Sequence, residues 1–233
     1  MAKYRIADFV VELKNCSEVT IERARKYLIK DDAPTDFVIE SSLLSAKERY
    51  PLCDDTTALY LYEGYLFSLQ MFRRGGLRFH SSAVVVDDRA YLFSAPSGTG
   101  KSTHTSKWLE LFGDRAYILN DDKPILRIMQ DGIYAYGSPW SGKNDISVNL
   151  GVKLEAICFL TRSEQNWIKP TEKAEAVFAS LTACYKKTDS ESMSLQLDVL
   201  EKILNAVPVY KMGCTPTLEA AKMSWETMSG KRD

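Results

Sequence analysis

Residues 94–105, SAPSGTGKSTHT, constrain the fold of this chain more than any other segment. The apolar stretch RAYLFSA leads into them and reads as a strand, whereas GKSTHTSKWLELF has the apolar spacing of a helix. A glycine-bearing turn between a strand and a helix is the context that a phosphate-binding loop of the form GxxxxGK[ST] requires. Ala95 replaces the first glycine of that pattern, while Gly100, Lys101 and Ser102 match the rest. The segment therefore predicts a phosphate-binding loop.

The chemistry of such a loop depends mainly on its backbone. Successive N–H groups can point into one concavity, and the helix N-terminus adds partial positive charge that favours phosphate. Gly98 and Gly100 supply conformational freedom, Lys101 can reach the β- and γ-phosphates, and the Ser102 hydroxyl can ligate Mg²⁺. Ala95 needs only a conformation open to an L-residue. The alternative is a glycine-rich turn with a solvated lysine. The expected nucleotide contacts are Ser97, Gly98, Thr99, Gly100, Lys101, Ser102 and Thr103.

Two adjacent carboxylates follow the next predicted strand, AYILN. Asp121 and Asp122 could serve a bound nucleotide in two ways, because one carboxylate can hold Mg²⁺ and the other can accept a proton from an attacking hydroxyl. We assign Ser102 and Asp121 to the metal and both aspartates to catalysis, together with Lys101. Which aspartate is the base stays open. The alternative is a strand-end turn with solvated aspartates.

The chain has two histidines, and one of them precedes the strand before the loop. His80 would be carried by a hairpin to one end of the sheet, where it could assist at the site. His104 falls in the first turn of the predicted loop helix and faces either the core or the phosphate. For each histidine, satisfied packing is the alternative.

A second unusual segment, YGSPWSGK, joins predicted strands at residues 136–143. Short connections that combine glycine, proline and tryptophan often carry function. We predict that this segment lines the site, with Ser138, Trp140 and Lys143 as candidate substrate contacts. Trp140 could equally fill a notch in the core, and Lys143 could be solvated.

The remaining patterns predict an α/β protein whose mixed sheet carries helices on its faces. RIADFVVEL and DFVIESS read as short strands, and ALYLYEGYLFSLQMF reads as a buried helix that ends at Arg73-Arg74-Gly75-Gly76. We treat residues 1–76 as a small N-terminal α+β subdomain and residues 77–233 as the domain of the phosphate-binding loop.

Within residues 77–233, FHSSAVVV and RAYLFSA predict a hairpin around Asp87-Asp88, and ILRIMQDGIYAYG predicts a second hairpin. LEAICFLTR is apolar enough for a central strand, followed by helices near AEAVFASLTACY and LQLDVLEKILNAV and the strand PVYKMG. Thr215 and Pro216 have the residue types of a helix N-cap and first helical residue. One face of that last helix would carry Leu218, Ala221, Trp225 and Met228.

Composition narrows the class of protein. The chain has 233 residues, 45% of them hydrophobic, and a net charge of −1, so nothing in its overall charge favours nucleic acid or an anionic membrane. The five cysteines form no CxxC pair, which favours free thiols in a reducing compartment. No apolar run approaches the length of a membrane span. We expect a cytoplasmic protein.

These motifs together resemble a known family. The segment FHSSAVVVDDRAYLFSAPSGTGKST, followed by LNDDKPIL, is similar to the C-terminal kinase domain of HPr kinase/phosphorylase and its relatives. Those proteins have a histidine before a strand, a hairpin, a phosphate-binding loop and a strand that ends in Asp-Asp. Their fold is shared with ATP-dependent phosphoenolpyruvate carboxykinase. The likeness covers residues 77 to 145 best and has no counterpart motif in residues 1–76.

The resemblance implies a Mg-ATP-dependent kinase that phosphorylates a hydroxyl, either a seryl group of a peptide or protein or a small molecule. It assigns phosphate and metal binding to Lys101 and Ser102, and it raises the expectation of a homo-oligomer. The loop departs from the family at Ala95, and Ser81 follows the histidine where the HPr-directed enzymes have glycine. HPr is therefore in doubt as the substrate. The alternatives are a nucleotide-binding regulatory module with little turnover and a small carboxykinase-like enzyme.

Overall fold

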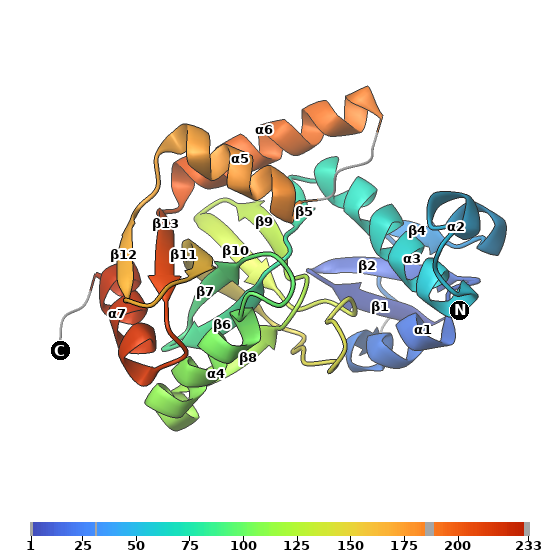
Figure 1. Cartoon of the computed structure of the whole chain (residues 1–233). Coiled ribbons are helices and arrows are strands. Elements are labelled where there is room, and N and C mark those ends of the chain that lie inside the picture. Colours follow the sequence, from blue (N-terminus) through green and yellow to red (C-terminus); the bar gives the residue numbers. More distant parts are fainter. Residues whose placement is uncertain (1, 31, 185–188, 231–233) are drawn as a thin grey trace.

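The computed structural model describes residues 2–30, 32–184 and 189–230. Its strands form two sheets (Figure 1). The first has four strands in the order β3-β1-β2-β4, and the second has nine strands, of which seven follow the order β5-β9-β10-β11-β7-β6-β8 while β13 pairs with β11 and β12 pairs with β13. The large sheet is mixed, because β11 runs parallel to β7 and β13 while the other pairs are antiparallel. The prediction of an α/β protein with a mixed sheet is confirmed.

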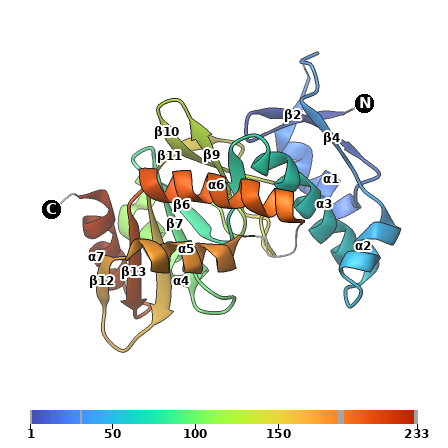
Figure 2. The ribbon, with the colours of Figure 1, turned by 90° about the horizontal axis from the view of Figure 1, so that it is seen from above.

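The elements before the large sheet gather at one end of the molecule, away from α7 (Figure 2). They are β1 (Lys3–Ile6), β2 (Phe9–Lys14), α1 (Glu18–Ala24), η1 (Arg25–Tyr27), β3 (Leu28–Ile29), β4 (Phe37–Glu40), α2 (Leu43–Arg49) and α3 (Asp55–Phe72). RIADFVVEL is a hairpin and not one strand, because Ala7 and Asp8 take positive φ angles of 50° and 64° and reverse the chain. The predicted helix α3 ends at Phe72 with Arg73 as its C-cap, next to the expected Arg-Arg-Gly-Gly stop.

The large sheet and its helices contain the elements from residue 76 onward. They are β5 (Gly76–Arg78), β6 (Ser82–Val86), β7 (Arg89–Ser94), α4 (Lys101–Phe112), η2 (Gly113–Arg115), β8 (Ala116–Asn120), β9 (Ile125–Met129), β10 (Gly132–Tyr136), β11 (Gly151–Arg162), β12 (Trp167–Pro170), α5 (Lys173–Ala183), α6 (Ser190–Ala206), β13 (Val209–Cys214) and α7 (Leu218–Ser229). The two predicted hairpins and the central strand are confirmed.

Two apolar layers enclose the large sheet. All five side chains of β6 are buried and alternate between the layers, with Ala83 and Val85 on one face and Val84 and Val86 on the other. The first layer includes side chains of α5 and α6, and the second includes side chains of α4 and α7. The two pairs of helices lie on opposite sides of the sheet (Figure 1). Burial on both faces explains why the central strands read as continuous apolar runs in the sequence.

The start of α7 differs from the prediction. Its N-cap is Thr217, whose hydroxyl accepts a hydrogen bond from the Ala220 N–H at 3.3 Å. Thr215 lies before the helix and its N–H and hydroxyl donate to the Asn166 side chain. Ala221 and Trp225 are buried as predicted, whereas Leu218 is 40% exposed because it lies at the first helical residue, beyond the edge of the apolar layer.

Side chains from residues 1–76 share an apolar cluster with the large sheet. Tyr4 and Ile6 of the small sheet and Phe67 of α3 belong to the same cluster as Ile125 and Trp140. The Phe67 and Trp140 rings pack with their centroids 4.9 Å apart. The first 76 residues therefore support the segment 137–150, which follows β10.

Candidate phosphate-binding site

Sheet topology brings the predicted site residues to one edge. β6 pairs antiparallel with both β7 and β8, so the start of β6 and the ends of β7 and β8 lie together. In register, Ser82 lies opposite Phe93, and Ala83 lies opposite Asn120. β6 separates β8 from β7, so these two strands are not neighbours in the sheet. The loop after β7, the Asp-Asp pair after β8 and His80 before β6 still converge.

Two glycines shape the loop between β7 and α4. Gly98 has a φ of 78°, and Gly100, the N-cap of α4, has a φ of 122°. An L-residue is strained at such angles. The Thr99 N–H donates to the Pro96 carbonyl at 3.2 Å, which closes a turn. Because no side chain caps α4, its first N–H groups are left for a ligand.

The end of the central strand holds this loop. Arg162, at the last residue of β11, donates through its guanidinium to the Gly98 carbonyl at 2.6 Å and to the Thr99 carbonyl at 3.3 Å. Its charge lies beside the loop and would also favour an anion there. We did not predict this role, although a basic residue at the end of an apolar central strand is a usable signal.

Lys101 crosses the base of the loop. Its side chain is only 9% exposed, and its Nζ donates to the Ala95 carbonyl at 2.8 Å. Burial lowers the pKa of Lys101, because removal from water disfavours the charged form, while Asp122 and Asp121 oppose this shift. The Ala95 methyl group packs in the apolar layer that also contains Trp108. An L-residue is therefore accommodated where the loop pattern usually has glycine.

Asp121 accepts hydrogen bonds through both carboxylate oxygens, one from β6 and one from α4. The Ser82 hydroxyl donates to Oδ1 at 2.7 Å, and the Ser102 hydroxyl donates to Oδ2 at 3.1 Å. Ser82 also contacts the Thr105 hydroxyl of α4 at 3.1 Å. A hydroxyl oxygen and a carboxylate oxygen this close are suitable hard ligands for Mg²⁺, which takes its other ligands from phosphate and water. The residues present therefore fit the predicted metal.

Asp122 lies between the side chains of His80 and Lys123. His80 Nε2 is 3.3 Å from Oδ1, and Lys123 Nζ donates to Oδ2. Burial by itself would raise the Asp122 pKa, but the hydrogen bond from His80 and the charge and hydrogen bond of Lys123 outweigh it. The net result is a pKa of about 2. Asp122 is therefore ionised throughout the neutral range and is held in one orientation.

Buried polar groups fix the turn that carries both aspartates. Asn120 is fully buried, and its Oδ1 accepts hydrogen bonds from the Asp122 N–H at 3.0 Å and the Lys123 N–H at 2.7 Å. Its Nδ2 donates to the Ser138 carbonyl at 3.1 Å. Gly142 packs directly on this turn, since a Cβ at that residue would be 2.9 Å from the Asp122 Cβ. Asn120 is a supporting residue that we did not identify from the sequence.

A cavity of about 470 Å³ lies between the loop and the Asp-Asp turn. Such a volume suits a small-molecule ligand. Its lining residues are His80, Ser97, Gly98, Gly100, Lys101, Ser102, Thr103, Asp121, Asp122, Gly142, Lys143 and Asn144. This set brings together nearly all the predicted nucleotide, metal and catalytic residues. Thr99 is not among them, because its N–H and carbonyl are used within the loop and by Arg162.

The segment 137–150 contributes to the cavity differently from our prediction. Lys143 lines the wall, but Ser138 is fully buried and Trp140 is 1% exposed, so their side chains lie in the interior. The Ser138 hydroxyl donates to the Lys123 carbonyl at 2.8 Å, and Trp140 packs on Phe67. Both residues therefore lie in the interior, on the side of the Asp121–Asp122 turn that faces away from the cavity. His104 likewise faces the core, where its Nε2 contacts the Ser224 hydroxyl at 3.0 Å.

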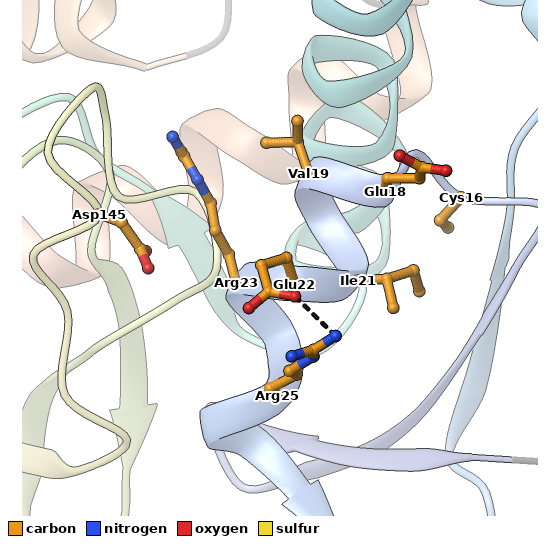
Figure 3. A pocket seen from close by; sticks show the side chains of 8 residues that line it. All are labelled: Cys16, Glu18, Val19, Ile21, Glu22, Arg23, Arg25 and Asp145. Carbon is orange, nitrogen blue, oxygen red and sulfur yellow. Dashed lines mark ion pairs between the residues drawn. The ribbon is translucent and has the colours of Figure 1, made fainter.

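A separate hollow of about 730 Å³ lies beside α1, with Asp145 across from it (Figure 3). Several of its charged side chains have partners. Glu22 and Arg25 form the ion pair drawn there at 2.8 Å, and Arg23 donates to the Tyr60 hydroxyl at 2.6 Å. The chemistry-bearing residues gather instead at the phosphate-loop cavity.

Three further observations concern metal ligands, cysteines and helix length. The part of the chain that the structure describes has no group of three or more His, Cys, Asp or Glu side chains placed to hold a metal without further ligands. All five cysteines are free thiols. Over residues 2–30, 32–184 and 189–230, no helix combines the length and apolar character needed to cross a bilayer.

Comparisons with known proteins include a distant structural match. No protein-family model matches the chain, and no curated protein matches it. Among solved structures, the HPr(Ser) kinase/phosphatase from Coxiella burnetii matches with a TM-score of 0.37 and 15% sequence identity. The match covers 66% of this chain and 88% of the other.

Proposed function

We propose that this protein is a Mg-ATP-dependent kinase of the HPr kinase-like group. It would transfer the γ-phosphoryl group to a hydroxyl, either a seryl group of a peptide or protein or a group of a small molecule. The supporting observation is the shared cavity of the glycine-shaped loop, Lys101, the Asp121–Asp122 pair and His80 at one sheet edge. A phosphate-binding loop alone would support nucleotide binding, whereas a carboxylate–histidine contact across it supports transfer.

In this proposal the loop and α4 position the nucleotide. The N–H groups of residues 98–102 and the helix N-terminus bind the phosphates, and Lys101 moves from the Ala95 carbonyl toward the transferred group. Ser102 and Asp121 would hold the metal. Bound Mg²⁺ supplies charge neutralisation on the phosphate oxygens.

The acceptor hydroxyl would lie against Asp122. Its oxygen forms a bond to the γ-phosphorus as the bond from that phosphorus to the bridging oxygen of the β-phosphate breaks, and ADP leaves. The hydroxyl proton passes to the Asp122 carboxylate. A carboxylate with a pKa of about 2 is a weak base, so we expect the proton to move late, when bond formation has made the hydroxyl acidic. His80 orients Asp122.

Nucleotide binding is the first test. Mg-ATP at about 100 times its Kd should raise the free energy of unfolding by roughly 2.7 kcal/mol. We expect Lys101→Ala to lose this stabilisation. Lys107→Ala is the matched control, because Lys107 lies on the same helix but is paired with Glu110 on the surface. No stabilisation of the wild-type protein by millimolar Mg-ATP would contradict the proposal.

Phosphoryl transfer is the second test. With γ-labelled ATP and a lysate of the source organism, the wild-type protein should label a protein or small-molecule fraction. Asp122→Asn should bind Mg-ATP yet lose transfer, whereas Asp114→Asn, at an exposed residue of η2, should keep it. Full transfer by Asp122→Asn would refute the assignment of Asp122 as the base. Nucleotide binding without any transfer by the wild-type protein would indicate a regulatory module instead.

A further inference from the structure

A further cavity of about 840 Å³ adjoins the phosphate-loop cavity, and His80 and Ser97 line both. It lies at the carboxyl ends of β7, β11 and β13, which run parallel to one another, and we call it the strand-end cavity. Ligands of α/β proteins usually bind at this end of parallel strands. The lining residues are His80, Ser94, Ala95, Pro96, Ser97, Phe159, Leu160, Thr161, Trp167, Lys169, Glu175, Ala179, Thr182, Ala183 and Lys211.

Sheet register builds the floor of the strand-end cavity. Phe159 of β11 lies opposite Ser94 of β7 and opposite Lys211 of β13. Lys211 in turn lies opposite Lys169 of β12. Residues that are opposite one another in a sheet share a face, so these four side chains form one row across four strands. Phe159 packs against the apolar layer that contains α5 and α6, so the row lies on that side of the sheet.

A second row places an aromatic ring in the wall. Thr161 of β11, Gly213 of β13 and Trp167 of β12 are register partners. A Cβ at Gly213 would be only 2.2 Å from the Trp167 Nε1, so this glycine leaves room for the ring to lie against the strand. The ring is nevertheless 39% exposed. Aromatic side chains contribute strongly to binding when a ligand covers them, so Trp167 offers a contact surface.

α5 covers the floor with small side chains. Ala179 and Ala183 both line the cavity, and residues four apart lie on the same face of a helix. Larger apolar side chains at these two residues would occupy the space between α5 and the sheet. The alanines therefore keep the strand-end cavity open.

Many polar groups of the lining have partners within the chain. The Lys211 Nζ donates to the Glu175 carboxylate, and the Lys169 Nζ lies 5.4 Å from the centre of the Trp167 ring. Three lining hydroxyls donate to backbone carbonyls: Ser94 to His80 at 2.9 Å, Thr161 to Met212 at 3.3 Å and Thr182 to Ala179 at 2.6 Å. A ligand would therefore gain most from covering apolar surface.

The strand-end cavity adjoins the end of the nucleotide at which transfer would occur. The N–H groups of a phosphate-binding loop hold the α- and β-phosphates, and its lysine reaches the β- and γ-phosphates. The Lys101 Nζ is 2.8 Å from the carbonyl of Ala95, a residue that lines the strand-end cavity. His80, which contacts Asp122, lines it as well. The γ-phosphate would therefore face this cavity, and the base of the nucleotide would extend away from it.

We propose that the strand-end cavity binds the apolar body of a small-molecule phosphoryl acceptor. This inference rests on the proposed kinase function. The acceptor is an alcohol with an aromatic or aliphatic body, and its hydroxyl extends past His80 to Asp122. The hydroxyl oxygen bonds to the γ-phosphorus as ADP leaves, and the hydroxyl proton passes to Asp122. The cavity volume lies within the range of about 300–1,000 Å³ that is usual for complete small-molecule ligands.

Intrinsic fluorescence offers a test at the cavity itself. Trp167 is 39% exposed, whereas Trp108, Trp140 and Trp225 are at most 5% exposed, so quenching by acrylamide reports mainly Trp167. Three probes are added separately, with and without saturating Mg-AMP-PNP: 2-phenylethanol, 4-phenyl-1-butanol and glycerol. We expect at least one phenyl alcohol to protect Trp167 from acrylamide under both conditions, and glycerol to leave the quenching unchanged. Trp167→Phe should remove the response.

Variants of α5 assign the binding to the strand-end cavity. Ala179→Leu fills the space and should weaken binding of the phenyl alcohol about tenfold or more, and the smaller change Ala179→Val should weaken it less. Ala174→Leu is the matched control, because Ala174 is exposed on the same helix and does not line the cavity. Retained affinity for Mg-AMP-PNP shows that each variant is folded.

The same variants connect the cavity with transfer. With γ-labelled ATP and a lysate of the source organism, the wild-type protein and Ala174→Leu should label a compound in the small-molecule fraction. Ala179→Leu should form this product about tenfold or more slowly, because the acceptor no longer fits.

The outcomes separate the two proposals. If Mg-AMP-PNP does not bind the wild-type protein, or if no fraction is labelled, the kinase proposal fails. If the nucleotide binds and transfer occurs but neither phenyl alcohol protects Trp167, or if Ala179→Leu behaves as the wild type does, the strand-end cavity is not the acceptor site. Loss of probe binding on adding Mg-AMP-PNP would place the nucleotide in this cavity and would overturn the inference. Label confined to the protein fraction would overturn it in favour of a peptide or protein acceptor.

Discussion

Acidification between pH 7 and pH 4 should destabilise the protein through one histidine. His104, in the first turn of α4, is 3% exposed, and its ring packs edge-on against Phe93 with centroids 4.6 Å apart. The Ser224 hydroxyl donates to the Ala221 carbonyl, so its lone pairs accept the Trp108 Nε1–H and His104 Nε2–H at 3.0 Å each. His104 is thus buried as a neutral donor.

The magnitude follows from the pKa. Burial lowers the His104 pKa from its ordinary value of 6.5 to about 4. Between these values the unfolded chain binds a proton that the folded protein does not, so stability falls as the pH falls. One pKa unit corresponds to 1.36 kcal/mol, which gives a loss of about 1 kcal/mol by pH 6, about 2 by pH 5 and about 3 by pH 4.

Urea unfolding of the wild-type protein and His104→Gln across this pH range would measure the effect. Glutamine keeps an N–H donor for Ser224 but does not titrate, so carboxylate contributions shared by the two proteins cancel in the difference. We expect the stability advantage of the wild type over the variant to shrink by about 2 kcal/mol between pH 7 and pH 5. Parallel stability curves over that interval would refute the reasoning.

Three further substitutions test the site and its support. Gly100 has a φ of 122°, so Gly100→Ala should strain the backbone by about 1–3 kcal/mol and should abolish stabilisation by Mg-ATP. Gly75 also has a positive φ but does not line the cavity, so Gly75→Ala should keep nucleotide binding. Arg162→Ala should weaken Mg-ATP binding about tenfold in calorimetry, since the Gly98 carbonyl loses its charged donor. Trp140→Ala should lower the free energy of unfolding by about 3–5 kcal/mol in urea, and unchanged stability would contradict its place in the core.

Local sequence patterns predicted many of the elements correctly. Asp87 and Asp88 turn the β6–β7 hairpin with φ angles of 49° and 58°, as an Asp-Asp pair between apolar runs suggests. Gly113 ends α4, and the continuous apolar run of β11 marks the centre of the sheet. These features depend on neighbouring residues or on burial of both strand faces, so they can be recognised without the tertiary structure.

Other elements could not be found in this way. β3 has two residues and β12 has four, and only their hydrogen-bonded pairing with β1 and β13 identifies them as strands. Trp140 was ambiguous between core and site because its neighbours do not determine which apolar surface it meets. Phe67, far away in the sequence, decides that it belongs to the core.

The sequence alone predicted a phosphate-binding loop, because the roles expected of Gly98, Gly100, Lys101 and Ser102 depend on backbone freedom and side-chain type. It also supplied the paired carboxylates. Only the tertiary structure decided that Asp122 faces His80 and Lys123, and that Arg78 lies behind them. The physical reason is strand direction: β6 runs against both β7 and β8, and this pairing of distant segments brings their ends to one edge.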